Sequence, residues 1–166
     1  MVGIDFALGF IAGEGCFSLV KKSYNKEKPY CVPQFQLGVD PKDAYLVQEV
    51  RENFGGIGTV YESEREFKWT VNSKDDMKKM CDIIDQHGSG PWLASQKRDA
   101  FQTWRKLVNI HSDGTSDDSD RVEMAHIAQN ETLNVDAGGR DAEWVSFIDW
   151  YAENRNVYTE ANRMSE

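Results

Sequence analysis

Apolar residues recur along the first two thirds of the chain with two different periods, which predicts a mixture of helices and strands. Alternation of apolar and polar positions predicts four strands, at residues 16–22, 31–39, 58–63 and 66–71. Helical spacing and helix start and stop residues predict helices at residues 5–14, 40–54, 74–86 and 95–110. This order predicts an α+β fold, in which helices cover one face of a four-stranded antiparallel sheet.

Local signals refine these elements. Pro33 indicates that the second strand begins at a sheet edge, because proline cannot donate to the ladder. Beyond residue 111 the pattern weakens, with a polar linker at 112–120 and helices expected at 121–130 and 142–154. We therefore expect a core domain at residues 1–111 and an acidic, helical C-terminal extension at 112–166 that packs on the same domain.

The two faces of the predicted sheet differ in character. The alternate positions that hold residues such as Phe17, Phe35 and Trp69 are apolar and should face the core. Glutamine, serine, threonine, lysine and tyrosine on a twisted ribbon suit the reading of base edges and phosphates in a major groove. The alternative is a merely solvated sheet face, which would carry more Glu and Lys and fewer Gln and Tyr. The candidate DNA-binding residues are Ser18, Val20, Lys22, Tyr24, Tyr30, Gln34, Gln36, Thr59, Tyr61, Ser63, Lys68 and Thr70.

The octet Leu8-Gly9-Phe10-Ile11-Ala12-Gly13-Glu14-Gly15 carries the most chemical information. Its glycines at 9 and 13 lie on one helical face, although glycine within a helix costs about 1 kcal/mol relative to alanine. Close approach of a second helix is the usual reason for such a pair. Glu14 follows directly, so a second helix packed in this way would bring its own Glu14 beside the first. Two carboxylates placed together could hold a divalent metal. The alternative is an ordinary helix C-terminus with a capping glycine and a solvated glutamate.

The octet, the strand after it, and the blocks at residues 35–39, 43–46, 54–60 and 93–101 together resemble the LAGLIDADG homing endonucleases in their single-motif form. The resemblance covers roughly residues 5–111 and implies an αββαββα fold. It implies a homodimer whose two motif helices meet at a two-fold axis. The interface residues that it implies are Leu8, Gly9, Ala12 and Gly13.

The activity implied by the resemblance is site-specific cleavage of both strands of a long pseudo-palindromic DNA target, in intron or intein homing. Glu14 of each subunit and the Gly13 carbonyl would hold Mg²⁺ (or Mn²⁺) at a scissile phosphate. Lys97 would stabilise charge at that phosphate, and Arg98 replaces it if the alignment is shifted by one residue.

One position departs from the family pattern. Many members have glutamine or a similar polar residue at the end of the second strand, where this chain has Val39. Asp40 could supply the polar group only if the strand breaks before Pro41. A non-catalytic nucleic-acid-binding protein of the same fold, such as an RNA maturase or a regulator, is therefore the alternative. Glu14 favours the enzyme and Val39 favours the binding protein.

The net charge of −9 opposes ordinary electrostatic binding to DNA. The acidic excess is confined to residues 113–166, because residues 1–112 contain 15 basic and 15 acidic residues. The acidic segment is interpreted either as a solvated surface or as adaptation to high intracellular salt. Three cysteines without metal-type spacing indicate a reducing compartment and no zinc site. We expect a location in the cytoplasm or an organellar matrix, without secretion and without a membrane partner.

Overall fold

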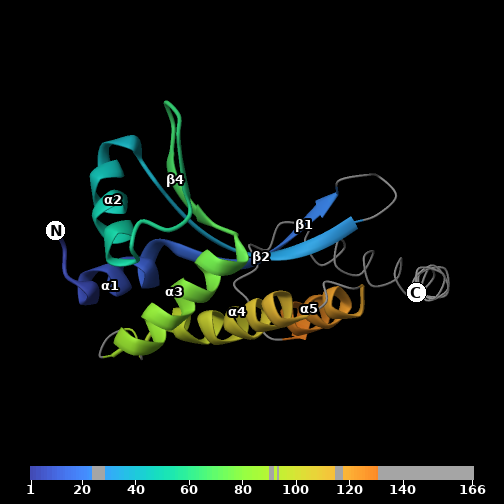
Figure 1. The fold of residues 1–166 in the computed structure, drawn as a ribbon. Coiled ribbons are helices and arrows are strands. Elements are labelled where there is room, and N and C mark those ends of the chain that lie inside the picture. Colours follow the sequence, from blue (N-terminus) through green and yellow to red (C-terminus); the bar gives the residue numbers. More distant parts are fainter. Residues whose placement is uncertain (24–28, 90–91, 93, 115–117, 131–166) are drawn as a thin grey trace.

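A computed structural model describes residues 1–23, 29–89, 92, 94–114 and 118–130 of the chain. Helices and strands follow one another in the order expected from the sequence (Figure 1). The helices are α1 (Ile4–Glu14), α2 (Ala44–Asn53), α3 (Lys74–His87), α4 (Gln96–Asp113) and α5 (Asp118–Asn130). The strands are β1 (Gly15–Ser23), β2 (Pro29–Val39), β3 (Thr59–Glu62) and β4 (Phe67–Val71), and a short 3-10 helix, η1 (Pro41–Asp43), precedes α2.

The four strands form one antiparallel sheet in the order β1-β2-β4-β3. β1 pairs with β2 along its whole length, whereas β4 pairs only with residues 35–39 of β2. Pro33 lies in the part of β2 that has β1 as its one described neighbour, so its missing N–H does not interrupt the ladder to β4. The predicted α+β architecture is confirmed.

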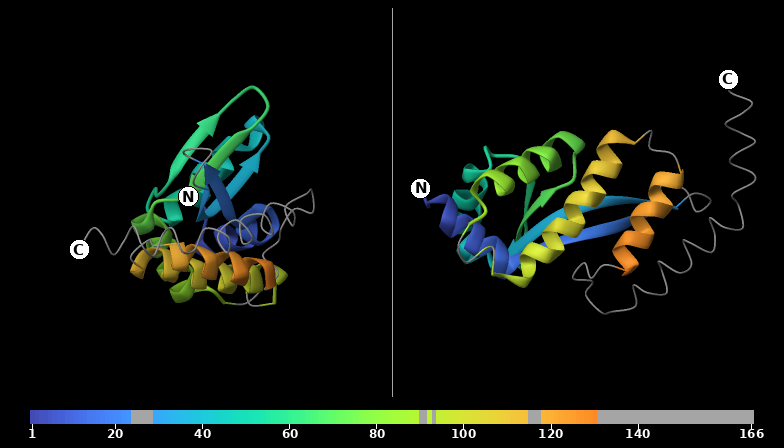
Figure 2. Two further views of the ribbon diagram at one scale, coloured as in Figure 1. Left: turned by 90° about the vertical axis from the view of Figure 1, so that its right-hand side faces the viewer. Right: turned by 90° about the horizontal axis from the view of Figure 1, so that it is seen from below.

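The core lies between the sheet and the helices. Phe17 of β1 pairs with Phe35 of β2, and the two ring centroids are 5.1 Å apart. Phe17 also lies 5.1 Å from Trp104 of α4, and Phe35 lies 5.1 Å from Trp69 of β4. All four side chains are fully buried. Viewed from the helical side, α4 crosses β1 and β2, which it contacts (Figure 2). The helices therefore cover the face that the apolar alternation marks as core.

The turn between α2 and β3 is fixed by side chains of the helical layer. Gly55, Gly56 and Gly58 adopt positive φ, which favours glycine. Arg51 of α2 donates from Nε to the Ile57 carbonyl at 2.9 Å and from Nη2 to the carbonyls of Gly56 and Gly58. This arginine satisfies backbone acceptors that the tight turn leaves without ladder partners, and so it sets where β3 begins.

α5 packs against α4 and against the paired strands β1 and β2. The Cys31 thiol of β2 donates to the Arg121 carbonyl of α5 at 3.5 Å. The predicted helix at 121–130 is therefore present and begins three residues earlier, at Asp118. Residues 131–166, including the helix expected at 142–154, lie outside the described residues, so the proposed division at residue 112 stays a prediction. No helix among the described residues is long and apolar enough to cross a membrane.

Candidate functional site

The joint between α1 and β1 carries the Gly-Glu-Gly sequence. α1 ends at Glu14, and the Gly15 N–H donates to the Ile11 carbonyl as the chain turns directly into β1. A Cβ atom at Gly15 would lie 2.7 Å from the Ile11 carbonyl oxygen and 2.9 Å from Cε2 of Phe35. Real Cβ atoms do not approach backbone and core rings so closely, so only glycine fits at this joint. The joint leaves the Glu14 side chain exposed.

Lys97 reaches this joint from 82 residues away. Its Nζ donates to the Gly15 carbonyl at 2.5 Å. Lys97 lies in the first turn of α4, and the ring of Phe17 packs 5.5 Å from Phe101 of the same helix. This aromatic packing places the start of α4 beside the start of β1. Arg98 instead lines a hollow on the α3 side, with Ile84 among its neighbours. The structure therefore brings Lys97, and not Arg98, to the motif.

The end of α1 is electrostatically suited to a cation. The Gly13 carbonyl has no partner within α1, because the N–H four residues on belongs to β1. The negative end of the helix dipole and the Glu14 carboxylate add to its attraction for positive charge. Both oxygens are hard donors of the kind that Mg²⁺ prefers. No group of three His, Cys, Asp or Glu side chains converges on a metal position within the described residues.

The end of β2 has an apolar residue at the position where the resemblance to the LAGLIDADG endonucleases implies a polar one. Val39 is half-buried and packs against the core. Asp40 is exposed, and its Oδ1 accepts from the Lys42 N–H at 3.0 Å, which caps η1. The expected alternative, in which Asp40 turns inward to replace the missing group, is therefore not adopted.

The strand register places most candidate DNA-binding residues on the face opposite the helices. Gln36 of β2 pairs with Thr70 of β4, which pairs with Thr59 of β3. Lys68 pairs with Tyr61, whose side chain is exposed. Three neighbouring strands thus present amide, hydroxyl, ammonium and phenol groups side by side.

Several candidates on this face behave differently from expectation. Ser18 and Gln34 are buried, at 9% and 6% exposure, and the Ser18 hydroxyl donates to the Gln34 carbonyl at 3.2 Å. The acceptor is the main-chain carbonyl of Gln34, so the bond ties the Ser18 hydroxyl to the neighbouring strand, and the low exposure of both side chains leaves little of either available to a ligand. Ser63 lies beyond β3, and its hydroxyl accepts from the N–H groups of Arg65 and Glu66 to close the β3–β4 turn.

The same face of the sheet involves three further predicted residues and two residues that were not predicted. Lys22 and Tyr30 pair in register, but their side chains are outside the description, and Tyr24 lies outside the described residues. Cys16 and Glu66 share the face and were not anticipated. Cys16 pairs with Gln36, and the sequence signal that could have found it is its alternation with Ser18.

α1 presents an uncovered face of its own. A Cβ atom at Gly9 or at Gly13 would meet nothing within 4 Å. On the same side, Phe6 is 46% exposed and its ring stacks on Phe10 with centroids 6.0 Å apart. Leu8, expected at a subunit interface, is 1% exposed and belongs to the core of its own chain. Leu8 precedes Gly9 by one residue, so the helix turns its side chain about 100° away from Gly9 and toward the core, whereas Phe6 lies three residues before Gly9 and shares its open face.

The comparisons with known proteins decide the family. The sequence pattern described as LAGLIDADG endonuclease matches residues 7–108, well over half of the chain. The chain belongs to the LAGLIDADG endonuclease family. No curated protein matches the sequence.

Solved structures of LAGLIDADG proteins share the fold. The homing endonuclease I-GzeII in complex with its DNA target is 24% identical, with a TM-score of 0.69, and the match covers 80% of this chain and 46% of that one. I-TnaI is 19% identical, with a TM-score of 0.72 and coverage of 89% and 98%. I-SmaMI, bound to an uncleaved DNA target in the presence of calcium ions, is 18% identical with a TM-score of 0.69 and coverage of 93% and 49%. The chain thus spans about half the length of I-GzeII and of I-SmaMI, and nearly all of I-TnaI.

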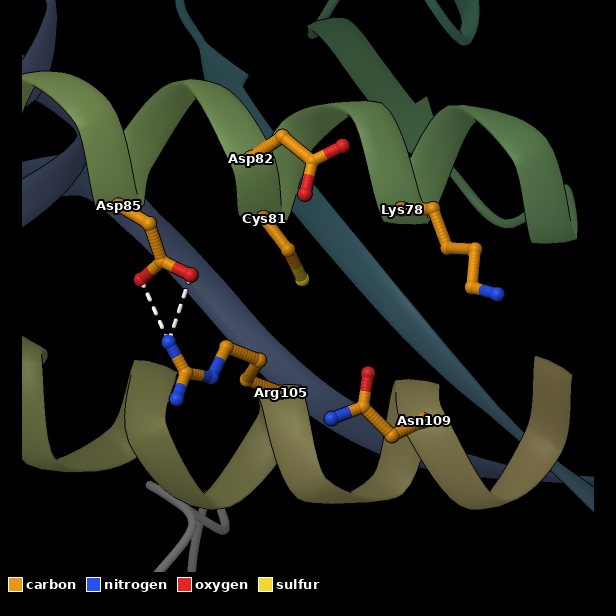
Figure 3. A pocket seen from close by; sticks show the side chains of 6 residues that line it. All are labelled: Lys78, Cys81, Asp82, Asp85, Arg105 and Asn109. Atoms are coloured by element: carbon orange, nitrogen blue, oxygen red, sulfur yellow. Dashed lines mark hydrogen bonds and ion pairs between the residues drawn. The ribbon is translucent and has the colours of Figure 1, made fainter. Parts of the chain in front are cut away.

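A cavity of about 470 Å³ in this LAGLIDADG chain lies between α3 and α4, away from the motif (Figure 3). Arg105 of α4 contacts both carboxylate oxygens of Asp85 of α3 at 2.6 Å across it. Burial raises the pKa of the Cys81 thiol in its wall to about 12, so this thiol stays protonated. The cavity contains neither motif residues nor residues of the sheet face, and we assign it a structural role in joining the two helices.

Proposed function

We propose that this LAGLIDADG protein is a homodimeric, Mg²⁺-dependent endonuclease that cuts both strands of a long pseudo-palindromic DNA target in intron or intein homing. The observation that carries the proposal is the contact between the Lys97 ammonium and the Gly15 carbonyl, next to Glu14. A carboxylate and an ammonium held at one rigid backbone joint supply the two charges that phosphodiester hydrolysis needs.

The roles of the individual groups follow from their chemistry. Glu14 and the Gly13 carbonyl would hold Mg²⁺ (or Mn²⁺), which when bound neutralises the phosphate and lowers the pKa of a nearby water. Lys97 carries a positive charge at the same place and would stabilise the extra negative charge on the phosphate oxygens in the transition state. Its present partner, a neutral carbonyl, holds the ammonium near that position without neutralising its charge.

Dimerisation is proposed because one chain supplies one Glu14, whereas cleavage of two strands needs two sites. The open face of α1 with Gly9 and Gly13 would admit a second α1 at close range. The adjacent exposed Phe6 gives this face an apolar component. The match to only about half of I-GzeII and I-SmaMI is consistent with an assembly of two such units. Two-fold symmetry of the protein in turn calls for two related half-sites in the DNA.

The DNA would lie on the sheet face opposite the helices. Gln36, Thr59, Tyr61, Lys68 and Thr70 offer donors and acceptors for base edges, and Val20 offers an apolar contact. Ser18 and Gln34, which are buried, would shape the surface beside these residues and would not themselves contact bases. Lys22, Tyr24, Tyr30 and Ser63 remain predictions for the outer part of the same surface.

The conditions of action are proposed from charge and thiols. The acidic segment 113–166 would make long-range attraction to DNA weak at low ionic strength, so adaptation to high salt is proposed. The three cysteines are all free, which is consistent with a reducing cytoplasm or organellar matrix.

A non-catalytic nucleic-acid-binding protein is the second candidate, and the observation that favours it concerns the end of β2. Val39 faces the core and Asp40 caps η1, so no polar side chain from this point is turned toward Glu14. If that group is required for ordering water, the chain would bind its target without cutting it.

The test uses the chain with the DNA sequence into which its intron or intein inserts, with and without Mg²⁺. We expect Mg²⁺-dependent cleavage of both strands. Glu14→Gln should abolish cleavage and leave binding largely intact, because it removes the charge and keeps the shape. Lys97→Met should slow single-turnover cleavage with a smaller effect on affinity. Glu62→Gln, which alters an exposed carboxylate on β3, is the matched control. Tight binding without cleavage by the wild-type chain would favour the second candidate.

A further inference from the structure

Glu66 and Lys68 form an ion pair on the sheet face that carries the proposed DNA contacts. The Lys68 Nζ lies 2.8 Å from Oε2 of Glu66, and both side chains are partly exposed. The other oxygen, Oε1, occupies the space where a Cβ atom of Gly38 would lie. Gly38 pairs with Lys68 in the sheet, so the pair extends across two strands. The absence of a side chain at residue 38 is what admits the carboxylate.

The pair lies close to the proposed cleavage residues along the sheet. Gly15 is the register partner of Leu37, and Gly38 is the next residue of β2. The strand position beside Gly38 is therefore the end of α1, where Glu14 is located. Groups above Gly38 would face bases near the cut and not at the far end of the target.

We propose that Glu66 and Lys68 together read one G·C base pair in the major groove of each half-site. This inference rests on the proposed function, and it adds a specificity-determining carboxylate that the sequence pattern did not indicate. The ammonium of Lys68 has three donors, one of which is directed to Glu66. The other two match the O6 and N7 acceptors of guanine, and Oε1 of Glu66 is left to accept from the N4 amino group of cytosine.

The order of hydrogen-bond donors and acceptors in the major groove decides whether Glu66 and Lys68 favour G·C or A·T. In the major groove G·C presents two neighbouring acceptors and then a donor, which matches two ammonium donors beside a carboxylate. A·T presents an acceptor, a donor and a further acceptor followed by the thymine methyl group. The carboxylate would then face the O4 acceptor of thymine, and this contact is repulsive. A carboxylate also repels phosphates, so it weakens binding wherever it finds no base donor.

The test is selection of bound duplexes from a pool of randomised DNA by the full-length chain, without Mg²⁺. The wild-type chain should select G·C at one symmetry-related position near the centre of the site. Glu66→Gln should reduce that preference by roughly tenfold at this position alone, the discrimination expected of one good base contact. Gly38→Ala should act in the same direction, because the added methyl group displaces the carboxylate without changing the charge.

The control is Glu62→Gln on the neighbouring strand. Glu62 pairs with Phe67, whose side chain is buried, so its exposed carboxylate belongs to the helix-facing side. This variant should leave the whole selected sequence unchanged. A wild-type chain that selects no sequence would contradict the proposed function itself. A wild-type chain that selects a site, with a Glu66→Gln profile that is unchanged or changed equally at every position, would overturn the reading by this pair.

Discussion

Replacing Gly9 by alanine should stabilise the single chain and weaken the proposed dimer. Gly9 lies in the middle of α1, and a Cβ atom there would meet nothing within 4 Å. The substitution therefore causes no clash within one chain and removes the helix penalty of glycine, about 1 kcal/mol. For a chain of this length, a gain of 1 kcal/mol raises Tm by about 2–4 °C.

The same methyl group has the opposite effect in a dimer that packs α1 against α1. Each chain adds one methyl group to a seam where two backbones would otherwise meet. Overpacking of a close contact costs about 1–3 kcal/mol. Because every 1.4 kcal/mol is tenfold in affinity, the dimer dissociation constant should rise by about 5- to 150-fold.

Two measurements separate these effects. Sedimentation of a dilution series gives the dissociation constant, and thermal unfolding at a concentration where monomer prevails gives the stability of one chain. Gly15→Ala is the comparison variant, because its methyl group would meet Ile11 and Phe35. Gly15→Ala should lower the Tm of the single chain, whereas Gly9→Ala should raise it. If Gly9→Ala raised Tm and left dimerisation unchanged, the open face of α1 would not be the seam. A wild-type chain that stayed monomeric on and off DNA would refute the dimer itself.

Three further predictions concern pH, thiols and salt. Burial, together with the nearby cations Lys74 and Arg121, holds the pKa of His111 below its ordinary value of 6.5. The free energy of unfolding should therefore fall as pH drops below about 6.5, because the unfolded chain then binds a proton that the folded chain does not. Urea unfolding measured at several pH values should show this fall in the wild-type chain, and His111→Gln should remove it. Cys16 is partly exposed, whereas Cys31 and Cys81 are buried, so one thiol in three should react quickly with an alkylating reagent, and bound DNA should protect it. Equal reactivity of all three thiols would contradict this. DNA affinity should fall only shallowly between about 0.1 and 2 M KCl because of the acidic segment 113–166, and a slope as steep as that of a basic DNA-binding protein would refute the salt adaptation.

The sequence determined the elements and the face that each one buries. Alternation in β1, β2 and β4 distinguishes core residues such as Phe17 from the opposite face, because the side-chain period of a strand is two. The start and stop residues gave the helix bounds to within a few positions, and the Gly-Glu-Gly joint marked the end of α1. These properties depend on neighbours in the chain, so a local pattern records them.

Contacts between elements were decided only by tertiary structure. Nothing in the spacing of residues shows that Lys97 meets the Gly15 carbonyl, or that the Glu66 carboxylate lies above Gly38. The burial of Ser18 and Gln34 was likewise hidden, because alternation shows on which face a side chain lies and not how much solvent reaches it. The physical reason is that such contacts depend on how separate elements pack and in which register they pair, and each of these is fixed by the whole core together.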